Sequence, residues 1–385
     1  MAGHPRAWLR PSQPRLAVQS PASAAILLVL AMAGAGCGGQ ASRITAVAGP
    51  IAGTATALTD GRVLLAGGFR GGSDPATPSA QLYDPADGAL TVTGSMTVAR
   101  EGQTATRLQD GRVLIVGGAN DSNGSPTSLT SAEIYDPTTG KFAPTGSLSE
   151  SNTGGMAVLL EDGRVLVMAT YTGEADLYDP HTGLFSQTGS MLEGRKWATA
   201  TLLGDGTVLV AGGLDGDLRS LSSAEVYDPA TGLFRATTPM SAPRSLHSAT
   251  ALPDGRVLIA GGESDYAHTV AHAEVYDPLT GSFTLSGSMI EPRSKHAAIA
   301  LTDGRILIVG GTNAIDRAVS SAELYDPSAG TFTRTGSMNL TRSWPMIASL
   351  PDGSVLVAGG RGNADSIRDS LEIFDPRAGA FTLVR

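Results

Sequence analysis

Five arginines occupy the same place in a repeated sequence pattern, ten residues before an Asp-Gly pair. They are Arg100, Arg195, Arg244, Arg293 and Arg342, and Pro50 and Asn152 take this place in two further copies. The guanidinium group forms paired hydrogen bonds with carboxylates and phosphates, so a ring of such side chains would suit an acidic ligand. The alternative is that each arginine forms an ion pair with an acid of its own or a neighbouring copy.

Histidines near these arginines raise the question of metal binding. His247 and His296 follow their arginines by three residues, and His268 and His272 lie between them in the chain. Two to four imidazoles at one rim could ligate a metal ion. Histidines that only form hydrogen bonds at the start of a strand are the commoner arrangement, and no dense acidic loop suggests Ca²⁺. We therefore predict no metal site and no cofactor.

Aromatic residues accompany two of the arginines. Trp197 and Trp344 follow theirs by two residues, while Tyr171 and Tyr266 lie in variable segments further along the copies. Exposed rings at such places would stack on a sugar, and the alternative is that they pack against the loops. Trp197, Trp344 and Tyr266 join the five arginines and the histidines His247 and His296 as candidate binding residues.

These residues belong to a unit that is written seven times. Asp-Gly recurs at Asp60, Asp110, Asp162, Asp205, Asp254, Asp303 and Asp352, and Tyr-Asp-Pro or Phe-Asp-Pro follows each time. In the later copies the spacing is constant, since 254−205, 303−254 and 352−303 each give 49. A fixed period of this length is typical of a repeat architecture.

Each unit contains four short apolar segments that are separated by turn residues. In the fifth copy we expect strands at residues 247–252, 256–262, 273–276 and 282–285, with Asp254-Gly255 as a two-residue type I′ hairpin turn. Small residues dominate the first strands, which must crowd around an axis, and a ring such as Phe283 marks the fourth. The pattern predicts an all-β fold, a seven-bladed β-propeller with four-stranded blades.

The paired glycines, the Ala-Glu-Val-Tyr-Asp-Pro strand and the ring in the fourth strand resemble kelch repeats over residues 44–385. Ala169-Thr170 replaces Gly-Gly in blade 3, and most blades carry Phe where kelch repeats usually have Trp. We expect blades at about residues 44–96, 97–148, 149–191, 192–240, 241–289, 290–338 and 339–385. No strand exchange is evident at ring closure, although residues near Ile44 could pair with the last blade.

The two faces of such a propeller differ in sequence. Strands alternate in direction, so the uniform Asp-Gly and Asp-Pro turns (connections 1–2 and 3–4) share one face, and their repetition marks them as structural. The recurrent acids Glu133, Glu225, Glu274, Glu323 and Glu372 are also interpreted as structural. Connections 2–3 and 4–1 vary and share the opposite face, which we call the variable face. The candidate binding residues lie there.

The N-terminal segment is typical of an export signal. Residues 1–23 are basic, residues 24–33 are apolar but too short to span a bilayer, and Gly34-Ala35-Gly36 precedes Cys37, the only cysteine. This resembles the lipobox of bacterial lipoproteins, with residues 1–36 as signal peptide, Cys37 as the lipidated residue and 37–43 as a short tether. The alternative is an ordinary signal peptide. We expect a protein of the bacterial cell envelope, at the outer membrane or cell surface.

The net charge of the chain argues against two classes of binding partner. Without the three arginines of residues 1–36, 24 Lys and Arg face 36 Asp and Glu, a net charge of −12, which argues against nucleic acid and against electrostatic membrane binding. Contact with the membrane would come only through the lipid anchor, and we expect a monomer.

The resemblance to kelch proteins leaves several functions open. Kelch proteins include copper-radical sugar oxidases, whose site needs a tyrosine cross-linked to a cysteine together with histidine ligands. The chain has no cysteine beyond Cys37, so this chemistry is not expected. Enzymes that resemble sugar-acid epimerases remain an alternative. No catalytic residues can be named. We expect a binding protein for an unknown glycan, peptide or protein partner.

Overall fold

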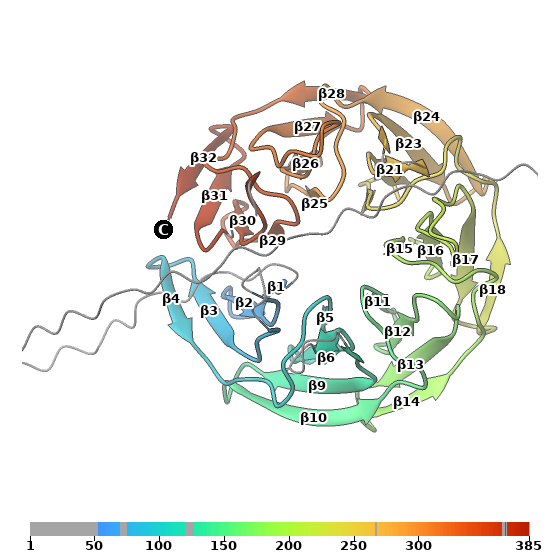
Figure 1. The fold of residues 1–385 in the computed structure, drawn as a ribbon, viewed down its shortest axis with the longest axis vertical. Helices are drawn as coiled ribbons and strands as arrows, with labels where there is room; N and C mark the ends of the chain where they lie inside the picture. The colour runs from blue at the N-terminus through green and yellow to red at the C-terminus, as the bar shows by residue number, and fades with distance from the viewer. Residues whose placement is uncertain are drawn as a thin grey trace, which may run out of the picture. The chain divides into compact units, whose positions relative to one another are not determined.

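The computed structural model describes residues 53–69, 75–120, 127–265, 268–363, 366 and 368–384. The expected signal peptide, Cys37, the tether and Tyr266 lie outside these residues. Residues Thr45–Arg385 belong to one compact unit. In it, seven four-stranded antiparallel sheets surround a central axis, with strands such as β5 nearest the axis and strands such as β10 outermost (Figure 1). The predicted seven-bladed β-propeller is confirmed.

The strands follow the chain in groups of four. Blade 1 contains β1 (Thr54–Ala57), β2 (Val63–Ala66), β3 (Ala80–Asp84) and β4 (Ala89–Val92), and blade 2 contains β5 (Thr104–Arg107), β6 (Val113–Val116), β9 (Ser131–Asp136) and β10 (Lys141–Ser147). Blade 3 contains β11 (Met156–Leu159), β12 (Val165–Met168), β13 (Ala175–Asp179) and β14 (Leu184–Gln187), and blade 4 contains β15 (Thr199–Leu202), β16 (Val208–Ala211), β17 (Ala224–Asp228) and β18 (Leu233–Ala236).

Blade 5 contains β19 (Ser248–Ala251), β20 (Val257–Ala260), β23 (His272–Asp277) and β24 (Ser282–Ser288), and blade 6 contains β25 (Ala297–Ala300), β26 (Ile306–Val309), β27 (Ala322–Asp326) and β28 (Thr331–Arg334). Blade 7 contains β29 (Met346–Ser349), β30 (Val355–Ala358), β31 (Leu371–Asp375) and β32 (Ala380–Leu383). Two small hairpins, β7 (Ala119–Asn120) with β8 (Thr127–Ser128) and β21 (Glu263–Ser264) with β22 (His268–Thr269), extend the 2–3 loops of blades 2 and 5.

The Asp-Gly loops have three residues, so the expected two-residue type I′ turn is wrong. In blade 5, the amide of Leu252 donates to the carbonyl of Arg256, and the amide of Gly255 donates to the carbonyl of Leu252. Gly255 has a φ of 86°, whereas Asp254 is not in the left-handed region. A three-residue hairpin loop needs a left-handed conformation at only its last position, which glycine adopts freely. The Asp254 carboxylate then accepts a hydrogen bond from the amide of Arg256 at 3.1 Å.

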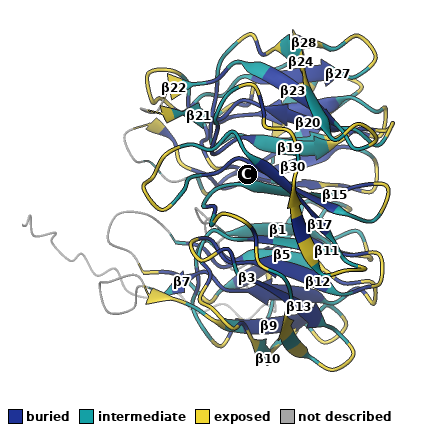
Figure 2. Cartoon of the chain, turned by 90° about the vertical axis from the view of Figure 1, so that its right-hand side faces the viewer, coloured by how far each residue is buried: buried dark blue, intermediate teal, exposed yellow. Residues whose placement is uncertain are grey.

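Hydrophobic packing occurs between neighbouring blades rather than inside single blades. One core cluster joins Leu64 and Leu82 of blade 1 to Val113, Ile115 and Tyr135 of blade 2. The second strands are buried along their whole length, and exposed residues lie in the loops at the two faces and on the outermost strands (Figure 2). Since each blade covers its neighbour, the blades are stable only as a ring.

The ring closes by packing of blade 7 on blade 1. A core cluster combines Leu65 and Tyr83 of blade 1 with Leu356 and Leu371 of blade 7, and β1 contacts β29. Among the described residues, each blade builds its sheet from its own consecutive strands. The described residues therefore contain no exchanged strand, and the pairing considered for residues near Ile44 lies outside them. In the residues that the structure describes, no helix is long and apolar enough to cross a membrane.

Candidate functional site

The five arginines are not available to a ligand. Each is at most 1 % exposed. The ion pairs are Arg100–Glu133, Arg195–Glu225, Arg244–Glu274, Arg293–Glu323 and Arg342–Glu372, with N–O distances between 2.6 and 3.0 Å. The prediction that these arginines form a binding rim is wrong, and the alternative, internal ion pairing, is what the structure contains.

The surroundings of Arg244 explain why its side chain turns inward. Its Nη1 donates to the carbonyl of Gly261 at 3.1 Å and to that of His272 at 3.2 Å, and its Nη2 donates to Glu274 at 2.6 Å. The second oxygen of Glu274 accepts a hydrogen bond from the amide of Ser241, in the loop that enters the blade, at 2.8 Å. Burial lowers the pKa of Arg244, and the Glu274 carboxylate opposes this change. The pair therefore ties the 4–1 loop, strand β23 and the glycine pair together.

The sequence contained a signal for this pairing. The five glutamates occur in the same five blades as the five arginines. Blade 3 carries Asn152 and Asp176 at the two places, and blade 1 carries the neutral Gln81 in place of the glutamate. Because a buried charge needs a partner, the occurrence of a glutamate in every blade that has the arginine indicates an internal ion pair rather than a ligand site.

The two candidate histidines connect neighbouring blades. His247 Nε2 lies 2.9 Å from Thr199 Oγ1 of blade 4, and His296 Nε2 lies 2.9 Å from Ser248 Oγ of blade 5. Burial and the neighbouring arginine lower the pKa of both imidazoles, that of His296 to about 3. Both rings are therefore neutral near pH 7. In the described residues, no group of three His, Cys, Asp or Glu side chains could hold a metal ion.

Trp197 and Trp344 meet at the channel mouth although they come from blades 4 and 7. Their ring centroids are 6.4 Å apart, with an angle of 56° between the ring planes. Trp344 is 38 % exposed. The Trp344 ring is therefore partly open to solvent, while Trp197 is half-buried.

The backbone at these tryptophans is left-handed. Trp197, Leu246, Lys295 and Trp344 take the same place in blades 4 to 7 and have φ values of 54° to 57°. A chain of hydrogen bonds joins them, from the amide of Leu246 to the carbonyl of Trp197, from Lys295 to Leu246 and from Trp344 to Lys295, at 2.8 to 3.1 Å.

Glycine does the same in two other blades. Gly102 and Gly154 occupy this place in blades 2 and 3, with φ values of 61° and 69°, and the amide of Gly154 donates to the carbonyl of Gly102 at 2.9 Å. A left-handed non-glycine residue costs about 1–3 kcal/mol. The scaffold therefore does not need a side chain at this place. The strained backbone of the two tryptophans was not predicted from the sequence.

Two further side chains extend the aromatic surface toward blade 3. Tyr171, in the short 2–3 loop of blade 3, is 57 % exposed. The Lys196 ammonium lies 5.4 Å from the centre of the Tyr171 ring and 4.6 Å from that of Trp197. We call Tyr171, Lys196, Trp197 and Trp344 the aromatic strip.

A pocket in the central channel adjoins the aromatic strip. Its volume is about 290 Å³, and its lining comes from the inner strands of blades 1, 2 and 7 and the start of blade 6: Gly53, Thr54, Ala55, Thr56, Ala105, His296, Trp344, Pro345 and Met346. None of these side chains carries a charge at neutral pH, since the pKa of His296 is lowered to about 3. We call this space the channel pocket.

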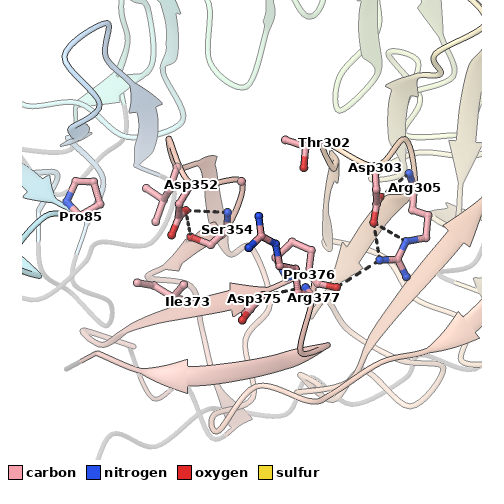
Figure 3. Close-up of a pocket in the computed structure, with 12 residues that line it drawn as sticks. Pro85, Thr302, Asp303, Arg305, Asp352, Ser354, Ile373, Asp375, Pro376 and Arg377 are labelled. Atoms are coloured by element: carbon pink, nitrogen blue, oxygen red, sulfur yellow. Dashed lines mark hydrogen bonds and ion pairs between the residues drawn. The ribbon is translucent and has the colours of Figure 1, made fainter.

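A larger hollow lies on the opposite face, among the uniform turns. It has a volume of about 800 Å³ and lies between the turns of blades 6 and 7 and Pro85 of blade 1. Ser354 stands where five other blades have an arginine, and in blade 6 that arginine, Arg305, reaches the Pro376 carbonyl of the next blade at 3.4 Å. Figure 3 shows this hydrogen bond and the short Ser354 side chain beside the hollow. The missing arginine thus explains the space.

Comparisons with known proteins agree with the repeat architecture. Residues 199–241 and 293–339 match the model of the kelch motif. No curated protein matches the sequence. A solved structure, a fungal alcohol oxidase of the AA5 family in complex with copper, superposes with a TM-score of 0.70 at 17 % identity and covers 87 % of this chain and 77 % of that chain.

This likeness shows the fold alone. Copper is part of the fungal oxidase complex and is not transferred to this chain at 17 % identity. Two kelch motifs, each lying within a ring of seven four-stranded blades, define the architecture. The chain is a kelch-repeat β-propeller.

Proposed function

We propose that the protein is a binding protein of the bacterial cell envelope that holds a glycan, peptide or protein partner on its variable face. The observation that carries the proposal is the aromatic strip. Blades 2 and 3 make the same backbone connection with Gly102 and Gly154, so the connection does not require the two indole side chains. Exposed rings beside a pocket are a common feature of binding sites.

Hydrogen bonds between blades join some of the described loop residues of the variable face. The amide of Ser220 in blade 4 donates to Asp265 of blade 5 at 2.8 Å. The amide of Ala318 in blade 6 donates to Asn363 of blade 7 at 2.9 Å, and Asn363 returns a hydrogen bond to the Ala318 carbonyl at 3.1 Å. Ordered loops lose less conformational entropy when a partner binds, which supports recognition by this face.

The sugar-acid epimerase alternative is weakened by the internal ion pairs. An enzyme of that kind needs cations that hold the acid of its substrate, and the five arginines are already paired with glutamates. We therefore propose binding rather than catalysis.

Site-directed photo-crosslinking in the producing cells tests which face meets the partner. A photoreactive phenylalanine analogue replaces Tyr171 or Ile315 on the variable face, or Leu279 on the opposite face as the matched control; these residues are 57 %, 69 % and 94 % exposed. We expect one discrete adduct from positions 171 and 315 and none from 279. Adducts from position 279 alone would contradict the proposal.

A further inference from the structure

We infer that the aromatic strip and the channel pocket form one site for a neutral linear oligosaccharide. One pyranose ring would lie in the channel pocket against Trp344, and the next sugars would follow Trp197 and Tyr171 toward blade 3. This inference rests on the proposed function and names the ligand class of the same site.

The lining of the channel pocket favours a small neutral group with hydroxyls. Thr54 and Thr56 on strand β1 bring hydroxyl groups, and Trp344 brings an indole. Arg293 and Arg342, from two of the blades that line the pocket, offer no partner for an acid, because both are fully buried in ion pairs. A volume of about 290 Å³ lies at the lower end of the range for ligand pockets and suits one sugar ring.

The aromatic strip continues outward from the pocket as a row of rings. Trp344 both lines the pocket and contacts Trp197 at 6.4 Å, and the Lys196 ammonium joins Trp197 to Tyr171. The apolar faces of sugar rings pack on such aromatic surfaces, while the three N–H donors of a lysine can meet sugar hydroxyls. The row therefore fits a chain of sugars better than a single one.

The backbone around the strip is already hydrogen-bonded, which disfavours an added peptide strand. Lys196 and Leu214 exchange both amide–carbonyl hydrogen bonds, at 2.9 and 2.7 Å. The carbonyl of Trp197 accepts from Leu246, and the amide of Trp344 donates to Lys295. A peptide that binds by strand addition needs free main-chain groups along an edge. The groups that remain for a ligand at the aromatic strip and the channel pocket are aromatic rings and hydroxyls of side chains.

Because the backbone is left-handed at both tryptophans, glycine variants can remove the rings while keeping this conformation. Trp197→Gly and Trp344→Gly would install the residue that blades 2 and 3 have at this place as Gly102 and Gly154. Glycine adopts this conformation without strain, which offsets part of the packing that is lost with the indole, so both variants should remain folded. The thermal unfolding midpoint of each variant is measured before the titration. Leu279→Ala, on the opposite face, is the matched control.

The test is a titration of the full chain with neutral hexasaccharides, followed by tryptophan fluorescence and calorimetry. The panel holds hexamers of glucose in α-1,4 and β-1,4 linkage, xylose, mannose and N-acetylglucosamine. The chain has three tryptophans, and two of them are Trp197 and Trp344, so binding at the strip changes the emission directly. We expect one hexamer to bind, and each Trp→Gly variant to lose at least about tenfold in affinity, which corresponds to about 1.4 kcal/mol.

Two results would overturn the inference. One is that no hexamer binds at millimolar concentration, and the other is that a hexamer binds the two Trp→Gly variants as tightly as the Leu279→Ala control. Adducts from positions 171 and 315 with a protein, combined with either result, would leave the proposed function intact and make the partner a polypeptide. Adducts only from position 279 would reject both.

Discussion

At the scale of single residues, the five arginine–glutamate pairs are buried and leave these arginines inaccessible to a ligand. A buried guanidinium needs an acceptor for its N–H groups, and Arg342 donates to the carbonyls of Gly359 and Ser370, to the Ser370 hydroxyl and to Glu372. Removing one partner of such a pair leaves the other charge buried and unpaired. The arginines therefore act on stability, and a loss of ligand binding in their variants would follow from unfolding.

Arg244→Met is expected to destabilise the protein by about 3–5 kcal/mol, because Glu274 stays buried without its cation. Adding Glu274→Gln, the side chain that blade 1 has as Gln81, should recover part of the loss. The measurement is the midpoint of urea unfolding. Arg256→Ala breaks an ion pair whose side chains are 40 % and 47 % exposed, and should cost at most about 1 kcal/mol. Equal shifts in Arg244→Met and Arg256→Ala would contradict the account.

The two buried histidines predict a loss of stability in mild acid. In the fold, the pKa of His296 is about 3 and that of His247 is also well below its ordinary value of 6.5. Below pH 6.5 the unfolded chain binds protons that the folded protein does not, so stability decreases as the pH falls and is fully present above 6.5.

The double variant His247→Gln and His296→Gln should flatten this decrease between about pH 7 and about pH 5. Glutamine is compatible with the site, because Gln103 takes the equivalent place in blade 2 and donates to the Ala66 carbonyl at 2.9 Å. Thermal unfolding midpoints across this range are the measurement. A variant that loses as much stability in acid as the natural protein would show that other groups cause the loss.

At the scale of strands and loops, the repeat made the fold predictable. A short apolar segment alone does not distinguish a strand from a helix, but the same pattern in seven copies does. The strands expected at residues 247–252 and 256–262 correspond to β19 and β20. The loop type was wrong because Asp-Gly alone does not say how many residues lie between the last paired positions. The meeting of Trp197 with Trp344 could not be predicted, since it joins blades that are not neighbours.

Glycine pairs after the second strands should tolerate no side chain. Gly310 and Gly311 have φ values of 67° and 96°, and added Cβ atoms would overlap the carbonyls of Arg342 and Ser294. The change Gly310→Ala with Gly311→Thr copies Ala169-Thr170 of blade 3 into blade 6, and should cost about 1–3 kcal/mol for each residue. Differential scanning calorimetry measures the effect. An unchanged transition would mean that the blade relaxes around the added atoms.

At the scale of the whole molecule, the repeated parts of the sequence and its variable parts lie at different places on the ring. The interblade cores, the Asp-Gly loops and the ion pairs recur around the axis, whereas the 2–3 and 4–1 loops differ from blade to blade. The hairpin strands β7, β21 and β22 protrude on the same side of the ring (Figure 2).

Attachment to the envelope is predicted from the sequence around Cys37. Cys37→Ser should abolish acylation and with it anchoring through acyl chains, because the thiol that would carry them is absent. Radiolabelled palmitate incorporation and cell fractionation are the measurements. Palmitate incorporation into Cys37→Ser, or none into the natural chain, would reject lipidation at this residue.

A footprint by amide hydrogen exchange tests most directly that the variable face is the binding face. The full chain is compared with and without its ligand, either the hexasaccharide with the strongest binding or the partner identified by crosslinking. We predict slower exchange in the segments around Tyr171, Trp197, Ile315 and Trp344, and no change in the Asp-Gly and Asp-Pro turns. Slower exchange confined to the turns around Ser354 and Arg377, beside the hollow in Figure 3, would contradict the account.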